Sequence, residues 1–290
     1  MGNVTCLFTQ IAPVSPTEGS LAMTMPTMLG AETVAPDTTS LSSFLPVADL
    51  GVLAVNAFVI HAEQPILVDT GAAALRQPFL AALADAIDPS DLRYIFLSHM
   101  DADHLGNLDA VLALAPQAKV LTNFLGMAKM MLQERDLSRV SLIEPGSEID
   151  LGDRRLVPLK PPYYDAPETT GFFDTKSRVL FSADAFGALL ESPETEAAAI
   201  APDALRDGML GWAAIDAPWL ATADGGKFGR LLRNIERLDP TAIVSGHLPV
   251  ARGVTGRLTR NLNDALSGGT FAVPDHDTFE RLLAEVAAAA

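Results

Sequence analysis

Short apolar runs, several of them followed within two residues by Asp or His, recur along this chain. Their β-branched and aromatic residues are typical of buried strands. Strands are therefore expected at Gly51–Ile60, Ile66–Val68, Tyr94–Leu97, Lys119–Leu121, Arg155–Leu159, Gly171–Phe173, Arg178–Ser182 and Ala242–Ser245. Residues 1–40 are rich in Pro, Thr and Met, which predicts irregular chain or short edge strands there.

Segments with helical periodicity lie between these runs and after them. Helices are expected at Ala72–Ile87, Leu108–Ala115, Gly126–Gln133, Gly225–Leu238, Thr255–Leu266 and Thr278–Ala290. Residues 192–224 form a mixed, partly helical insert that carries Trp212 and Trp219. The chain begins with strands and continues with two stretches in which strands alternate with helices. This order predicts two sheets packed face to face with helices outside.

Residues 98–107 place two histidines and two aspartates within six positions, directly after an expected strand. In an extended chain His99, Asp101 and Asp103 point to one side, whereas His99 and His104 would not share a helix face. This favours a strand that ends in a loop of metal ligands. Imidazole and carboxylate together suit Zn, Fe or Mn, and four donors this close suit a two-metal site. The alternative is a polar loop that happens to be rich in His and Asp.

Polar residues end three further strands, which places the expected site along one edge of the sandwich. Asp69 comes before Thr70-Gly71, where it would brace a metal loop, cap the next helix or form a plain turn. Asp184 and His247 each follow an expected strand by two residues.

Composition limits the classes of partner. The chain has 290 residues, 49% of them hydrophobic and 6% aromatic, as in ordinary soluble α/β proteins. Its net charge of -16 disfavours nucleic acid and anionic membrane as partners. A single cysteine, Cys6, excludes an internal disulfide. Since the chain also shows no signal-peptide pattern and no run near the ~20 apolar residues of a membrane span, a cytoplasmic protein is expected.

The order Asp69-Thr70-Gly71, His99-x-Asp101-x-Asp103-His104, Asp184 and Gly246-His247 resembles the metallo-β-lactamase superfamily. Within it, the chain is similar to the di-iron domain of flavodiiron proteins and to stand-alone oxygen-binding di-iron proteins. Asp101 stands where hydrolases of the superfamily usually have a second His, and the segments 115–120 and 180–187 resemble the same branch.

This resemblance covers roughly residues 50–250 and implies an α/β (α+β) fold, a four-layer αββα metallo-β-lactamase-like sandwich. We expect a single domain over residues 1–290, with its core at about 45–250 and C-terminal helices at about 255–290.

The sequence departs from the flavodiiron pattern in two respects. The family has a His nineteen residues before its bridging Asp, and counting back from Asp184 leads to Asp165. No His lies between His104 and His247 to replace it, and His61 and His276 are expected to be surface or structural residues. The family's flavodoxin domain is also not expected in this sequence, in which too few residues follow His247 to form one.

The resemblance implies that one metal is held by His99, Asp101, Asp165 and the bridging Asp184. The other metal would be held by Asp103, Asp184 and His247. His104 is a further ligand in only some relatives, and Asp103 and His104 are the expected catalytic residues. Asp165 either binds metal or points to solvent.

If Asp165 binds, four carboxylates cancel the charges of two divalent ions. This predicts a lower reduction potential than in relatives with the His. It also favours iron or manganese over zinc.

The favoured function is a dinuclear non-haem metal protein that binds or reduces O2 or NO. Iron is the favoured metal for its two ions, with zinc and manganese as alternatives. Its electrons would come from an external donor protein, either a reductase or a rubredoxin-like partner. One alternative is a hydrolase whose metal-bridging water attacks an ester, thioester, lactone or phosphoester. Another is an O2-sensing or binding module without turnover. A homodimer is expected by analogy with the family, although the reason for it, a flavin meeting the di-iron site across subunits, lapses here.

Aromatic residues near the expected ligands leave two interpretations open. Trp212 and Trp219 would either roof the site for a small apolar gas or pack the core. Tyr163 and Tyr164, next to Asp165, would either bond a bound oxygen species or stabilise the Pro-rich loop 161–168.

Overall fold

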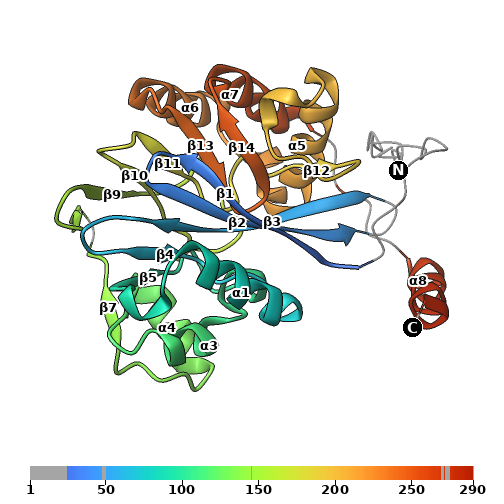
Figure 1. The fold of residues 1–290 in the computed structure, drawn as a ribbon. Helices are drawn as coiled ribbons and strands as arrows, with labels where there is room; N and C mark the ends of the chain where they lie inside the picture. The colour runs from blue at the N-terminus through green and yellow to red at the C-terminus, as the bar shows by residue number, and fades with distance from the viewer. Residues whose placement is uncertain (1–24, 48–49, 145, 269–270, 272–274, 290) are drawn as a thin grey trace, which may run out of the picture.

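The computed structural model describes residues 25–47, 50–144, 146–268, 271 and 275–289. Two β-sheets pack face to face with helices on both outer faces (Figure 1), which confirms the predicted four-layer sandwich. One sheet has the order β1-β2-β3-β4-β5-β6-β7, with β12 beside β3. Its strands are β1 (Thr27–Ala35), β2 (Thr38–Val47), β3 (Gly51–Ile60), β4 (Ile66–Val68), β5 (Tyr94–Phe96), β6 (Lys119–Thr122), β7 (Val140–Leu142) and β12 (Leu189–Leu190).

The second sheet has the order β14-β13-β11-β10-β9-β8. Its strands are β8 (Ile149–Asp150), β9 (Arg155–Leu159), β10 (Gly171–Asp174), β11 (Val179–Phe181), β13 (Ala242–Ser245) and β14 (Leu248–Arg252). Strand β11 pairs with β13 in parallel, as β4 pairs with β5 in the first sheet. Parallel neighbours end at the same edge of a sheet, so the residues that follow these four strands are brought together in pairs.

Helices cover the outer face of each sheet because each helix has one apolar side to bury. On the first sheet lie α1 (Arg76–Ala86), α3 (Leu108–Leu114) and α4 (Phe124–Leu132), and on the second lie α5 (Pro202–Asp216), α6 (Gly225–Leu238) and α7 (Thr255–Asp264). Short 3-10 turns complete the connections at η1 (Ala73–Leu75), η2 (Pro89–Asp91), η3 (Ala197–Ala199), η4 (Pro218–Thr222) and η5 (Ala265–Ser267). Among the residues described, no helix is both long enough and apolar enough to cross a membrane.

Four phenylalanines fill the space between the sheets. Phe172 stacks on Phe181 with ring centroids 4.3 Å apart, and the edges of Phe96 and Phe58 meet this pair at 4.9 and 5.5 Å. Rings packed in this way exclude water from the middle of the sandwich. Polar side chains therefore have room to gather only toward its rim.

Most of the predicted elements are present, and the differences are mainly short strands and the region before residue 50. Of the two alternatives predicted for residues 25–40, the edge strand is present as β1, but it is nine residues long, and β2 lies inside the sheet between β1 and β3. Strands β1 and β2 pair from Thr27 opposite Phe44 to Ala35 opposite Thr38. The prediction for residues 1–24 lies outside the described residues. Strand β14 was not predicted. The C-terminal helix α8 (His276–Ala289) was predicted, and Asp275 accepts a hydrogen bond from the Thr278 amide near its start.

Candidate metal centre

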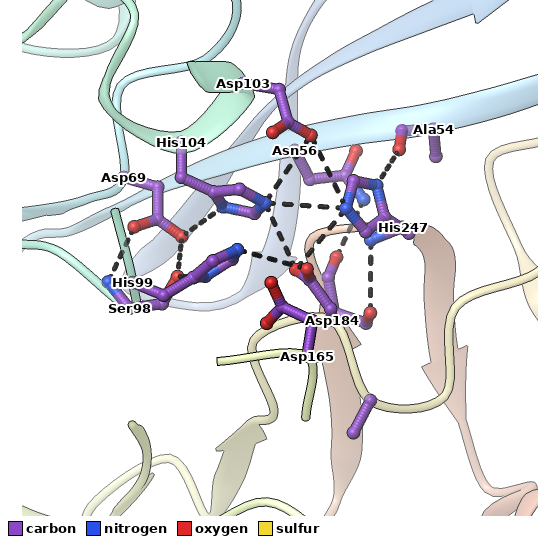
Figure 2. Close-up of polar contacts among 12 residues, drawn as sticks. Ala54, Asn56, Asp69, Ser98, His99, Asp103, His104, Asp165, Asp184 and His247 are labelled. Atoms are coloured by element: carbon purple, nitrogen blue, oxygen red, sulfur yellow. Dashed lines mark hydrogen bonds and ion pairs between the residues drawn. The ribbon is translucent and has the colours of Figure 1, made fainter. Parts of the chain in front are cut away.

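Three buried histidines meet where β5 and β13 end. His99 and His104 are 0% exposed and His247 is 1% exposed. The rings of His99 and His104 lie 4.1 Å apart, and Nε2 of His104 is 3.4 Å from Nε2 of His247. All three rings therefore direct Nε2 toward one small region (Figure 2).

Asp69 fixes the orientation of two of these rings. Its Oδ2 accepts a hydrogen bond of 2.9 Å from Nδ1 of His104 and one of 2.7 Å from the hydroxyl of Ser98. Since that hydroxyl donates to Asp69, its oxygen is left to accept from Nδ1 of His99 at 3.0 Å. Both imidazoles thus carry a proton on Nδ1, so Nε2 is the nitrogen left to bind a metal. Of the interpretations open for Asp69, bracing the ligand loop agrees with these contacts.

His247 is held by strand β3. Its Nδ1 donates to the carbonyl of Ala54 at 2.7 Å, which again leaves Nε2 free to bind. The side-chain amide of Asn56 donates to the carbonyls of Ser245 and Leu248, each at 2.9 Å. A strand of the first sheet therefore positions the loop that follows β13 of the second sheet.

Asp184 lies between the histidines and is 3% exposed. Its Oδ2 is 3.1 Å from Nε2 of His99, while its Oδ1 is 3.1 Å from Nε2 of His104 and 3.3 Å from Nε2 of His247. Asp103 completes the second set, with Oδ2 3.5 Å from Nε2 of His247 and 3.6 Å from that of His104. Each oxygen of the Asp184 carboxylate thus faces a separate group of possible metal ligands.

Asp101 and Asp165 lie on the side of His99. The ligand atoms of His99, Asp101 and Asp165 lie within 4.8 Å of one another, and both carboxylates are exposed. Asp165 is not turned away: it lies beside Asp184 in Figure 2 and accepts a hydrogen bond of 3.3 Å from Thr169. All seven residues expected from the sequence therefore meet at one place.

Two lysines hold the loop that carries Asp165. Lys160 donates 2.7 Å hydrogen bonds to the carbonyls of Pro167 and Thr169. Lys129 of α4 pairs with Glu168, which is 1% exposed. The residues that directly follow Asp165 are thus tied down, which limits how far its carboxylate moves.

Strained backbone and a glycine shape the floor of the centre. Asp69, Ala183 and Phe186 have φ of 58°, 50° and 70°, a region that residues other than Gly rarely adopt. A Cβ on Gly246 would lie 2.7 Å from Cε1 of His104 and 3.1 Å from Oδ1 of Asp184. Only glycine lets the His247 loop approach this closely.

Opposite charges determine the protonation of the histidines and of Asp184. Burial opposes a charge on His104, but Asp184, Asp69 and Asp103 outweigh it and raise the pKa of His104 well above its usual value. Burial likewise opposes a charge on Asp184, yet His104, His247 and His99 hold the pKa of its carboxyl well below the usual range. Positive charge, whether protons or metal ions, is therefore favoured between these residues.

The donor set fits two metal ions. Nε2 of His99 and Oδ1 of Asp184 are buried without a hydrogen-bond partner, although each lies about 3 Å from another donor atom. Ligands bonded at about 2.0–2.2 Å to one ion lie roughly 3.0–3.5 Å apart, and these atoms have that spacing. The first set would be His99, Asp101, Asp165 and Oδ2 of Asp184, and the second Asp103, His104, His247 and Oδ1 of Asp184.

Residues 53–247 match the model of a protein family described as ODP family beta lactamase. The chain belongs to this family. It is 29% identical over 215 residues to diflavin flavoprotein A 1 of Synechocystis, a match that covers 70% of this chain and 35% of that protein. The predicted resemblance to the metallo-β-lactamase superfamily and its flavodiiron branch is confirmed.

Solved structures share the fold of this ODP-family chain. Rubredoxin oxygen:oxidoreductase from Desulfovibrio gigas superposes with a TM-score of 0.70 and 21% identity, over 82% of this chain and 61% of that one. The flavodiiron protein of Giardia intestinalis gives a TM-score of 0.69 and 16% identity, over 82% and 59%. The chain thus spans little more than half of these proteins.

The structure corrects one detail of the sequence interpretation. Residues 102–105 form a short helix, α2 (Ala102–Leu105), so Asp103 and His104 lie on a helical turn rather than on extended chain. The side chains meet because β4, β5, β11 and β13 end together, and shared parity plays no part. His61 and His276 lie elsewhere, as expected, bonded to Thr39 and Glu280.

Trp212, from the insert of this ODP-family chain, belongs to the buried core and also borders the centre. Its indole Nε1 donates to the carbonyl of Asp184 at 3.2 Å, and its ring lies 4.5 Å from that of His247. Trp219 is 40% exposed and donates to the carbonyl of Tyr164 instead. Tyr163 is fully buried, and its hydroxyl is 3.4 Å from the same Asp184 carbonyl, which agrees with the structural interpretation.

Asp216, the last residue of α5, was missed by the sequence interpretation. Its ligand atom lies within 4.8 Å of those of Asp165 and Asp184. Burial, followed by the charge of Asp184, raises the pKa of Asp216 to about 7. The available signal was its position four residues after Trp212, on the same face of a helix.

Proposed function

We propose that this chain binds two iron ions and uses them to bind or reduce O2 or NO, with electrons from an external donor protein. The observation that carries the proposal is Asp184, whose two oxygens face two donor sets made of three histidines and three further aspartates. Such oxygen-rich sets favour iron or manganese over zinc. Iron at this position would supply electrons to the bound gas.

The surroundings suit a small apolar reactant. Trp212, which is 9% exposed, packs against the ring of His247 and the backbone of Asp184, so an apolar side chain borders the inner side of the centre. Asp101 and Asp165 are exposed, so solvent, gas and electrons reach the centre from their side. Asp69, Ser98 and Ala54 hold the three imidazoles in place, so that loading the metals requires little rearrangement.

The donor is proposed to be a separate protein, either a reductase or a rubredoxin-like protein. The Desulfovibrio gigas relative is named for both rubredoxin and oxygen, and this chain spans 61% of its length. A cytoplasmic location and a homodimer remain proposals, the first from the single Cys6 and the second from analogy with the family.

Hydrolysis is the second candidate function. The family description names a beta lactamase, and His104 lies within the second donor set, as a hydrolytic two-metal centre would require. Against hydrolysis stands Asp101, a carboxylate where hydrolases of the superfamily usually have His. The two functions call for different metals and substrates, so metal analysis and activity assays on one purified sample distinguish them.

The experiment measures metal content and then reactivity. Protein purified without added metal is analysed for iron, zinc and manganese, and is then reduced anaerobically and mixed with O2. About two irons per chain, with O2 uptake sustained by a chemical reductant, are the expected results. Two zincs per chain, no O2 uptake after iron loading, and cleavage of a thioester or lactone would establish hydrolysis instead.

A further inference from the structure

Asp216 reaches the centre from a different part of the fold than the seven residues above. It is the last residue of α5, on the outer side of the second sheet. One turn earlier, Trp212 bonds to the Asp184 carbonyl and thereby fixes the end of this helix against the centre. Asp216 is thus held in place by packing and is not carried on a free loop.

The environment of Asp216 lacks a partner for its carboxylate. Its Oδ2 is buried and accepts no hydrogen bond, and the nearest carboxylates are those of Asp165 and Asp184. Asp184 is itself 3% exposed and has an unpartnered Oδ1, and His99 presents an unpartnered Nε2 from 0% exposure. Three carboxylates gathered in this way are stabilised when a cation lies between them.

The spacing fits a shared ion. Two ligands on opposite sides of one ion lie about 4–4.4 Å apart, given bonds of about 2.0–2.2 Å. Asp216, Asp165 and Asp184 place one ligand atom each within 4.8 Å. Two of these three residues, Asp165 and Asp184, also belong to the set around His99, so Asp216 lies at the edge of that set.

We propose that Asp216 is a further ligand of the metal held by His99, Asp101, Asp165 and Asp184. This rests on the metal centre of the proposed function and deepens it. That metal would have four carboxylates and a single nitrogen, a set that selects a hard divalent cation such as Mn2+ or Fe2+. Asp216 then supplies a carboxylate from a fixed helix end, whereas Asp165 supplies one from an exposed loop.

Calorimetric titration of the full, metal-free chain with Mn2+ tests this. Wild-type protein is expected to bind two ions, and Asp216→Asn to bind one of them at least about tenfold more weakly while keeping the other unchanged. Asp216→Glu, which retains the charge, should recover part of the loss. Asp203→Asn, at the exposed first turn of the same helix, is the matched control and should bind like wild type.

Stability measurements separate ligation from packing. In EDTA, Asp216→Asn should unfold at an equal or higher urea concentration than wild type, because a buried repulsion is removed. Unchanged Mn2+ affinity in Asp216→Asn would overturn the proposal, and so would equal weakening of both sites together with a lower urea midpoint. Since Mn2+ binding needs neither O2 nor an electron donor, a failed O2 assay would leave this inference standing.

Discussion

Asp69 accepts a 2.9 Å hydrogen bond from Nδ1 of His104, on the side of the ring that faces away from the metal centre. The two residues come from different strand ends, and the φ of 58° at Asp69 turns its carboxylate toward the ring. The same carboxylate receives the amide and the hydroxyl of Ser98. One side chain thus sets the aim of His104 directly and that of His99 through a hydroxyl.

Asp69→Asn should weaken metal binding about 10- to 100-fold without abolishing folding, because the rings lose their charged anchor but keep their packing. The measurement is competition for Zn2+ or Mn2+ with a chelator of known affinity. Asp91→Asn, on the exposed turn η2, serves as the control. Equal affinities in the two variants would show that Asp69 does not orient the ligands.

Gly246→Ala should lower the metal content below two ions per chain. The added methyl group would lie 2.7 Å from Cε1 of His104, so either the ring or the His247 loop must move. Metal analysis after dialysis, with Gly211→Ala as control, checks this. Gly211 lies in α5, where a Cβ makes an ordinary contact of 3.5 Å with Leu189. Two tightly bound ions in Gly246→Ala would contradict the expectation.

Asp165→His should raise the reduction potential of the iron-loaded protein. The substitution removes one negative charge beside the metals, and an anionic ligand stabilises the more oxidised state. Redox titration followed by electron paramagnetic resonance measures the change. Asp165→Asn, also neutral, separates the effect of charge from that of imidazole. A potential that stays the same or falls in Asp165→His would refute the charge argument.

Arg154→Met should lower the free energy of unfolding of the metal-free chain by about 3 kcal/mol. The Arg154 side chain is 0% exposed and binds Asp37, Asp153 and Asp174, so its loss leaves Asp174 buried and uncompensated. Urea unfolding measures the change. Arg155→Met, whose charge is exposed and pairs with Glu148, is the control and should lose well under 1 kcal/mol.

Arg154→Met should also make the free energy of unfolding depend less on pH. Hydrogen bonds from Arg154 hold the pKa values of Asp37 and Asp153 below the usual range. A lowered folded-state pKa gives stability that is present above the unfolded value near ~4 and is lost as the pH falls further. Wild type should therefore lose more stability than Arg154→Met between pH 6 and pH 3. Parallel losses would show that other carboxyls dominate.

Local pattern was sufficient for the parts of the fold where side chains alternate or repeat regularly. Helix α6 and strand β13 begin and end where the sequence predicted, since their apolar residues and flanking Asp224 and Pro240 mark both ends. The long pairing of β1 with β2 was not predicted because Thr38, Ser40 and Ser43 are polar yet buried, so hydrophobicity does not mark the inward face of β2. Its stability comes from pairing with β3, which no local pattern reveals.

The residues of the candidate centre also divide into those that the local sequence reveals and those that it does not. His99, Asp101, Asp103 and His104 were evident because they cluster in sequence. Asp216 was not, because an acidic residue at the end of a helix usually faces solvent. Only the packing of Trp212 against Asp184 turns it inward. Contacts between residues far apart in sequence, unlike clustered motifs, depend on how the layers meet.

The donors come from both halves of the sandwich: His99, Asp101, Asp103 and His104 follow a strand of the first sheet, and Asp184 and His247 follow strands of the second. A newly made chain therefore has no complete pocket until its last strands have been synthesised and the halves have closed. Ions bound by the complete set would therefore enter after the halves have closed, and they would stabilise the closed rim against reopening.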